Sequence, residues 1–118
     1  MDGEGRTIVF GNLFRYDAAR NRWTETIAPN PPPPRSAHQA VAHGGYLYVH
    51  GGEFTSPSQE RFHHYRDLWR FDLKANAWAR LPDKGGPSAR SGHRMVAHPK
   101  GKRPLLFGGV YDNGKEIQ

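Results

Sequence analysis

Seven histidines are the residues of this chain that could hold a metal ion or move protons. They are His38, His43, His50, His63, His64, His93 and His98. His38 and His43 lie five residues apart in a strand-like segment, as do His93 and His98, so the members of each pair face opposite sides. No cysteine, helical His-x-x-x-His or carboxylate spacing accompanies them. We therefore predict no metal site. We interpret His38 and His93, which lie 55 residues apart, as equivalent residues of a repeated sequence, each at the start of a strand.

A glycine-containing stretch, residues 85–92, superficially resembles a phosphate-binding loop. It lacks the Gly-Lys-Ser/Thr ending of such loops, and Pro87 removes one of the backbone N–H donors that would contact a phosphate. A Gly-x-Ser-x-Gly nucleophile elbow is also absent, and no spacing supports a Ser/His/Asp set. We predict that the protein is not an enzyme, that it has no catalytic residue and that it needs no cofactor.

The long polar and aromatic segment 53–66 is the best candidate for binding. Its candidate contact residues are Phe54, Arg61, Phe62, His64, Tyr65 and Arg66. Aromatic residues and arginine are enriched at the energetic centres of protein interfaces, and loops on a rigid scaffold often carry binding. A second interpretation remains open, in which the segment folds back and caps its own sheet with Phe62 and Tyr65 buried.

A repeat of 55 residues organises the chain. Arg35-Ser36-Ala37-His38 recurs as Arg90-Ser91-Gly92-His93, and Phe14-Arg15-Tyr16-Asp17 recurs as Trp69-Arg70-Phe71-Asp72. Trp23 recurs as Trp78 at the same spacing. The stretch from Arg35 to Trp78 contains every part of the repeat once.

Short strands fill each repeat, because apolar and polar residues alternate and glycine or asparagine follows. The composition, with 14 glycines and 10 prolines, also favours strands and turns over helices. Strands are predicted at 7–10, 13–18, 22–25, 36–43, 46–50, 68–73, 91–98 and 105–107, with a further strand around Trp78 before Leu81. Gly44-Gly45 is predicted to close a two-residue hairpin between the fourth and fifth of these. We expect an all-β protein.

The proline-rich segment 28–34 separates the first unit from the second. Its five prolines cannot sit inside a sheet ladder, so an extended, polyproline-like connector is predicted. The spacing of Pro31 and Pro34 also fits a docking peptide for an SH3 or WW module. We favour the connector, since Pro87 occupies the matching place before Arg90.

The repeated pattern resembles the kelch repeat, which forms one four-stranded blade of a β-propeller. The pattern consists of Arg-Ser-x-His, a strand ending in Gly-Gly, Asp-Leu-Trp-x-Phe-Asp and a tryptophan six residues further on. The residues that carry it are Gly51, Gly52, Trp69, Phe71, Trp78, Gly108, Gly109 and Trp23. The amino-acid sequences of segments 37–41, 51–54 and 90–96 resemble the kelch domain-containing protein 4 group in particular. The resemblance implies that Phe14, Tyr16 and Trp23, like their counterparts in the second unit, are buried between blades.

The resemblance divides the chain into three units. Residues 1–34 hold a partial kelch unit and the connector, residues 35–83 a complete repeat, and residues 84–118 a partial repeat. The first unit lacks a first strand, the second glycine after Gly11 and the long loop. The strands of the three units together amount to about two blades, whereas propellers close with ~4 to 8. The resemblance therefore implies antiparallel four-stranded blades in an incomplete β-propeller fragment.

Kelch repeats imply a protein–protein interaction module or scaffold, and we expect one or more protein partners. Two alternatives stay open. The chain could be a truncated segment of a longer propeller without a function of its own, with unpaired blade edges that promote self-association. Less favoured is part of an enzyme similar to galactose oxidase, whose copper site uses Cys and Tyr ligands; this chain has no cysteine.

The net charge of +6 could indicate a nucleic-acid partner. The basic residues are scattered except for Lys100 to Arg103, so nucleic acid is not favoured as a partner. Residues 1–5 do not read as a signal peptide, and no apolar run reaches the ~20 residues of a spanning helix. We expect no membrane partner and a cytoplasmic or nuclear location.

Overall fold

The computed structural model describes residues 5–98, 100–101 and 103–112. These residues form ten β-strands and no helix. The strands are β1 (Leu13–Asp17), β2 (Arg22–Thr26), β3 (Gln39–His43), β4 (Tyr46–His50), β5 (Glu53–Thr55), β6 (Phe62–His64), β7 (Leu68–Asp72), β8 (Ala77–Leu81), β9 (Arg94–Ala97) and β10 (Pro104–Phe107). Within the described ranges, no helix is long and apolar enough to cross a membrane.

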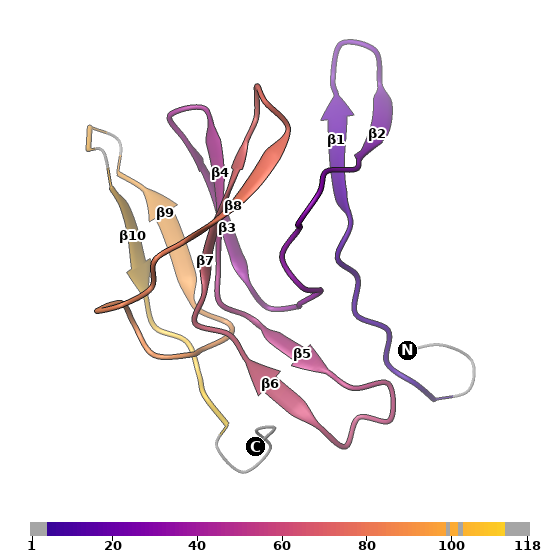
Figure 1. Ribbon diagram of the computed structural model, residues 1–118, viewed down its shortest axis with the longest axis vertical. Helices are drawn as coiled ribbons and strands as arrows, with labels where there is room; N and C mark the ends of the chain where they lie inside the picture. The colour runs from indigo at the N-terminus through magenta and orange to yellow at the C-terminus, as the bar shows by residue number, and fades with distance from the viewer. Residues whose placement is uncertain (1–4, 99, 102, 113–118) are drawn as a thin grey trace.

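One four-stranded antiparallel sheet, in the order β3-β4-β7-β8, forms the centre of the molecule (Figure 1). We call it the central blade. Gly44 and Gly45 turn β3 into β4, with φ angles of 60° and 84° that residues with a Cβ rarely adopt. Phe71 lies opposite Leu47 on one side and Trp78 on the other, at the middle of the sheet. The predicted all-β fold of antiparallel four-stranded blades is confirmed.

Two-stranded sheets flank the central blade on opposite sides, and we call them half-blades (Figure 1). β1 pairs with β2, and β9 pairs with β10. The bounds of β1 and β2 equal those of β7 and β8 shifted by 55 residues, so the repeat seen in the sequence is also a repeat of structure. The first half-blade therefore holds the third and fourth strands of a blade, and the second holds the first and second.

Segment 53–66, expected to be a loop, is largely a β-hairpin. β5 and β6 pair antiparallel, with Thr55 opposite Phe62, and the hairpin projects from the end of the central blade (Figure 1). Phe54 and Phe62 are β-formers in adjacent strands, and the polar tip at 56–61 supplies the turn. Hydrogen bonds from Thr7 N to Pro57 O and from Gln59 Nε2 to Thr7 Oγ1 tie the N-terminal segment to this tip.

Several predicted strands are shorter than expected, and one is absent. Residues 7–10 are not a strand, because they bond to the hairpin tip through Thr7 and do not pair with a neighbouring strand. β3 begins at Gln39 and not at Ser36, since Ala37 has a φ of 56° that interrupts the extended backbone. Gly92, with a φ of 68°, delays the start of β9 in the same way. The predicted strand over 91–98 is therefore reduced to Arg94–Ala97.

The apolar core lies in the central blade and against the half-blade β9–β10. Its buried hydrophobic residues are Val49, Phe71 and Met95. Tyr16, the repeat counterpart of Phe71, is 47% exposed, whereas Phe71 is 0% exposed. Phe14 and Trp23 are exposed as well, so the expectation that these residues are buried between blades is wrong. The reason is that the described chain places no sheet against their face.

The paired glycines after β4 and β10 fill the structural role that the repeat predicts. Gly51, Gly52, Gly108 and Gly109 all have positive φ, between 69° and 105°. A Cβ on Gly52 would lie 2.7 Å from Ser36 O, and one on Gly109 would lie 2.9 Å from His93 Cβ. Backbone from the start of the same unit passes where a side chain would be.

Candidate interaction site

A buried ion pair anchors the end of the central blade from which the hairpin projects. Arg35 donates through Nη1 to Asp67 Oδ1 at 2.6 Å and through Nη2 to Oδ2 at 2.9 Å. Both residues are buried, and Trp69 Nε1 donates to the same carboxylate at 2.7 Å. Burial would raise the pKa of Asp67, but the hydrogen bonds from Arg35 and Trp69 outweigh it and lower that pKa. The pair therefore stays charged.

The repeat places Arg90 in nearly the same arrangement. Arg35 donates to Pro33 O and Gly51 O, and Arg90 donates to the equivalent carbonyls of Ser88 and Gly108. An arginine opening each repeat thus holds the Gly-Gly strand end. The sequence shows Arg35 and Arg90 as a recurring pair, but Asp67 as the acidic partner is visible only in the folded chain.

Two of the six candidate contact residues pack against other parts of the protein: His64 is buried and Tyr65 is half-buried. The Tyr65 ring covers the Arg35 guanidinium at 4.0 Å, and its hydroxyl donates to Pro34 O at 3.4 Å. Burial raises the pKa of Tyr65. His64 is buried, with Nε2 3.5 Å from Glu53 Oε2 and its ring 5.0 Å from that of Tyr111. Phe62 and Tyr65, the two residues that the capping interpretation expects to be buried, are both half-buried.

The other four candidates reach solvent to different degrees. Phe54 and Phe62 are half-buried on the two strands of the hairpin, and Arg61 is exposed at its tip. Arg66 is exposed after β6, and its Nη2 donates to Asp83 O at 3.2 Å. The six residues are thus not one surface, and a binding role for them stays a prediction.

A cleft of about 410 Å³ lies between the base of the hairpin and the end of β8. Its lining residues are Pro33, His63, His64, Tyr65, Arg66, Asp67, Trp69, Arg80, Asp83 and Ala89. Arg66 and Arg80 share the Asp83 carboxylate, at 3.8 Å and 3.6 Å respectively. Arg35 already neutralises Asp67, so two guanidinium groups face one available carboxylate. The cleft therefore carries a net positive charge, and half of each arginine side chain or more is exposed.

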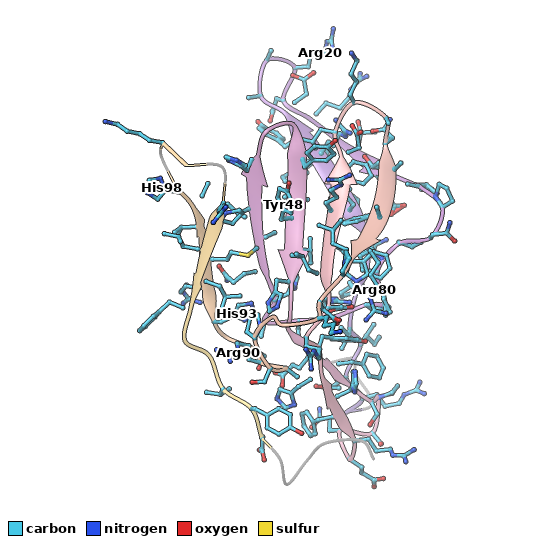
Figure 2. The ribbon with its side chains drawn as sticks, turned by 60° about the vertical axis from the view of Figure 1, so that its left-hand side comes forward. Arg20, Tyr48, Arg80, Arg90, His93 and His98 are labelled. Carbon is cyan, nitrogen blue, oxygen red and sulfur yellow. The ribbon has the colours of Figure 1, made fainter. Side chains whose placement is uncertain are left out.

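Arg80 and Asp83 were missed by sequence reasoning. Arg80 lies near the end of β8 and Asp83 follows that strand. Only the β7–β8 pairing brings the end of β8 back beside the start of β7. Figure 2 shows Arg80 on the side of the molecule away from His98 and far from Arg20, which lies at the tip of the β1–β2 turn. No local pattern would have linked these residues.

His50 and His93 form a buried contact between the central blade and the half-blade β9–β10. His50 Nδ1 and His93 Nε2 are 3.1 Å apart, and their rings meet edge to face. Among the described residues, His50 Nε2 and His93 Nδ1 have no hydrogen-bond partner. Burial lowers the pKa of His50 to about 4 and lowers that of His93, with each also affected by nearby cationic arginines. This pair is therefore neutral at neutral pH.

Within the part of the chain that the structure describes, no cluster of three or more His, Cys, Asp or Glu side chains could hold a metal ion. His38 and His93 immediately precede β3 and β9, in agreement with their interpretation as repeat residues. His38 packs at Gly52, as His93 packs at Gly109.

A comparison with known families decides the identity of the repeat. The KLHDC2/KLHL20/DRC7 Kelch-repeats domain matches residues 2–109. The chain belongs to the kelch-repeat family.

Several kelch proteins are similar to this chain. Kelch domain-containing protein 10 of Mus musculus is 32% identical, over 82% of this chain and 26% of that protein. Kelch domain-containing protein 3 of Homo sapiens is 30% identical, over 92% of the chain and 28% of that protein. The Rho GTPase-activating protein gacHH of Dictyostelium discoideum is 36% identical, over 91% of the chain and 7% of that protein. The kelch chain described here thus spans about a quarter or less of these relatives.

A solved structure supports the propeller geometry. The structure of YjhT superimposes with a TM-score of 0.70 and 26% identity, over 87% of this chain and 29% of the other. The kelch chain is therefore a portion of a propeller, with one full blade and two half-blades. The specific similarity to the kelch domain-containing protein 4 group is not shown by these comparisons.

Proposed function

We propose that this kelch chain is a non-catalytic protein-interaction module, and that its contact surface combines hairpin β5–β6 with the cleft at Arg66 and Arg80. The observation that carries the proposal is the sharing of one carboxylate, Asp83, by two exposed arginines. Membership of the kelch-repeat family is consistent with an interaction role.

The chemistry of the cleft suggests an acidic segment of a partner protein. A guanidinium group binds carboxylates through paired N–H donors, and such charge-assisted bonds are stronger than neutral ones. A partner carboxylate would satisfy donors of Arg66 and Arg80 that Asp83 alone does not saturate. The buried Arg35–Asp67 pair below the cleft keeps its walls in place. Phe54 and Phe62 would add apolar contact beside it.

Selection of peptides from a random library on the immobilised chain would test this proposal. We expect selected peptides to be enriched in Asp and Glu, with binding that weakens as salt rises. Arg66→Ala and Arg80→Ala should each weaken a selected peptide about 10-fold or more, since a hydrogen bond to a charged group contributes ~1.5–3 kcal/mol. Arg20→Ala, an exposed arginine on the β1–β2 turn, is the matched control and should leave affinity unchanged. Selected peptides without acidic enrichment, bound equally by all variants, would contradict the proposal.

The hairpin contribution needs a separate set of variants. Alanine at Phe54, Arg61 or Phe62 should weaken capture of the same peptides, with thermal unfolding measured for each variant because both phenylalanines are half-buried. Unchanged capture by all three folded variants would confine the binding surface to the cleft.

Other proposals about this chain are independent of the cleft. A propeller enzyme similar to galactose oxidase is the alternative function, and turnover of any member of a substrate panel would favour it over a non-catalytic role. We also propose a cytoplasmic or nuclear location, which imaging of a fluorescent fusion would test. We also propose that the chain belongs to the kelch domain-containing protein 4 group within this family. This proposal rests on the amino-acid sequences of segments 37–41 and 51–54.

A further inference from the structure

Residues 7–10 hold the place in the first unit that β4 holds in the central one. Phe10 corresponds to His50, the last residue of β4, and Leu13 corresponds to Leu68, the first residue of β7. In the central blade His50 lies opposite Leu68. The repeat therefore assigns residues 7–10 to the edge of β1, whereas the structure places them along the hairpin β5–β6 (Figure 1).

We propose that segment 7–10 is a strap that leaves the tip of hairpin β5–β6 and pairs with β1 of the same chain, which adds the second strand of a blade to the first half-blade. At the tip, Thr7 N donates to Pro57 O, and Gln59 Nε2 donates to Thr7 Oγ1 at 2.6 Å. The two positions exclude each other, so pairing with β1 uncovers Pro57 and Gln59. This movement is independent of the proposed cleft function.

The backbone groups of β1 have the direction that this pairing needs. In the central blade, Gly51 N donates to Asp67 O at one end of the β4–β7 ladder. Because hydrogen-bonded pairs alternate along an antiparallel ladder, Trp69 also directs its backbone groups to β4. Its repeat counterpart Phe14 therefore directs its own groups to the open edge of β1. In the register of the central blade, Val9 is the residue that comes to lie opposite Phe14.

The chain between these two residues can make the turn. Residues 10–13 form a four-residue loop, a length common in β-hairpins, and Gly11 and Asn12 at its centre are turn-forming residue types. At the far end of the strap, the same register brings Arg6 opposite Asp17, which places a cation across from an anion. The local sequence therefore supports the hairpin at both ends.

A cavity of about 180 Å³ lies where the strap would pack. It separates the first half-blade from the central blade, and its lining includes Leu13 of β1 and Leu47 and Val49 of β4. Ile8 of the strap would lie opposite Arg15, whose guanidinium already reaches the central blade across the same gap. Since opposite residues of paired strands share a face, Ile8 would point into this mostly apolar cavity.

The burial of repeat counterparts differs as the position of the strap predicts. His93 is 0% exposed and lies against His50, whereas His38, the counterpart of His93, is exposed. At the hairpin, Ile8 is 54% exposed and Phe10 is 72% exposed. On β1, Phe10 takes the place that His50 has in the central blade and covers His38. Both side chains of the strap then leave water.

Disulfide trapping tests the pairing, because the chain has no cysteine of its own. Val9 and Phe14 would form a hydrogen-bonded pair with Cα atoms ~5.5 Å apart, a distance that a disulfide can bridge. In a chain that runs extended from the hairpin into β1, the same atoms are ~16 Å apart. We expect the Val9→Cys/Phe14→Cys variant, oxidised at low concentration, to form an intramolecular disulfide that mass spectrometry detects.

The matched control places the two thiols on opposite faces of the hairpin. Ile8→Cys/Phe14→Cys moves one cysteine by a single residue, and successive side chains of a strand point to opposite faces. This variant should not form the disulfide under the same conditions. Equal yields from the two double variants would show an unstructured segment and overturn the proposal, and so would the absence of the Val9–Phe14 disulfide.

Competition between the two positions has its own test. Gln59→Ala removes the hydrogen bond to Thr7 Oγ1, which should free the strap and speed trapping of the Val9→Cys/Phe14→Cys variant roughly two- to tenfold. Ser58→Ala is the control at the same tip, because the Ser58 hydroxyl lies 3.2 Å from Ser56 Oγ and not at the strap. An unchanged rate with Gln59→Ala would overturn the competition.

The locked form also tests where the strap packs. Diethyl pyrocarbonate modifies accessible imidazoles, and its reaction with His38 should slow severalfold when the Val9–Phe14 disulfide is formed, compared with the same variant kept reduced. The exposed His98 should react at the same rate in both forms and serves as the internal control. An unchanged rate at His38 would mean that Phe10 does not cover it, which would overturn the proposed position of the strap.

Discussion

At the scale of single residues, repeat positions with the same role carry different chemistry. Arg35 and Arg90 open equivalent units and hold equivalent carbonyls. His50 ends β4 where the two other units have Phe10 and Phe107. Only the central unit therefore has an imidazole at this position, where it contacts a second imidazole, that of His93, and the other two units have an apolar phenylalanine. We expect this substitution to make stability depend on pH.

The His50–His93 contact should destabilise the protein as the pH falls. Both folded-state pKa values are lowered, His50 to about 4, while unfolded histidines titrate near 6.5. Below ~6.5 the unfolded chain binds more protons than the folded one, so the free energy of unfolding falls as the pH falls, and the contribution of His50 levels off below about pH 4. Urea unfolding followed from pH 7.5 to 4 measures the effect.

His50→Phe is the variant that isolates this term, because phenylalanine is the residue of the other repeats. The pH dependence between 6.5 and 4 should become shallower, since one of the two buried titrating groups is gone. His98→Phe, at an exposed histidine, is the control and should keep the original slope. A slope unaltered by His50→Phe would contradict the assignment.

At the scale of the elements, the strand ends depend on close backbone approach more than on side-chain packing. Gly51 and Gly52 let the Arg-Ser-x-His segments of two successive units approach the end of β4. Gly52 N donates to Arg90 O at 2.8 Å, so the paired glycines also link the central blade to the next unit. The hairpin β5–β6 begins immediately after these two glycines, at Glu53, so their backbone conformation sets the direction in which the hairpin leaves the blade.

Gly52→Ala should destabilise the protein far more than Gly44→Ala. Both glycines have positive φ, which costs an L-residue ~1–2 kcal/mol. Only at Gly52 would the new Cβ clash, at 2.7 Å from Ser36 O and 2.8 Å from His38 Cβ, whereas nothing lies within 4 Å of a Cβ at Gly44. Urea midpoints of the two variants measure the difference, and equal losses would show that strain and not close approach dominates.

At the scale of the whole molecule, most of the stabilising packing lies in the central blade. The half-blade β9–β10 packs on β3 and buries Met95, whereas β1–β2 connects to the central blade through Arg15, which donates to Leu73 O and Asn76 Oδ1. The Arg15 guanidinium also lies 5.7 Å from the Phe71 ring. The first half-blade is therefore the more weakly attached of the two.

The repeat offers a direct test of this distribution. Phe71→Ala removes a fully buried ring and should cost ~3–5 kcal/mol in the free energy of unfolding. Tyr16→Ala, at the same repeat position, removes a half-exposed ring that contacts Trp23 at 5.0 Å and should cost much less. Measurement at a concentration where the chain is monomeric keeps any contact between copies out of the comparison. Similar losses for both would contradict the unequal core.

The sequence by itself determined the repeat, the all-β fold and most strand positions. It could do so because alternation, Gly-Gly endings and aromatic spacing are local patterns, and the register of β1 and β2 follows from that of β7 and β8. The six candidate contact residues could also be picked out from the local sequence, but their positions relative to one another could not. Segment 53–66 was expected as a loop because its strands are short and separated by a polar tip.

Only the tertiary structure decided which of those residues face solvent and what surrounds them. It placed Tyr65 on Arg35, buried His64, and brought Arg80 and Asp83 to Arg66. These contacts join residues on different strands, whose proximity depends on how the sheets pair and pack. Burial of Phe71 and exposure of Tyr16 have the same origin, because equivalent positions of a repeat are buried only where another sheet or strand covers them.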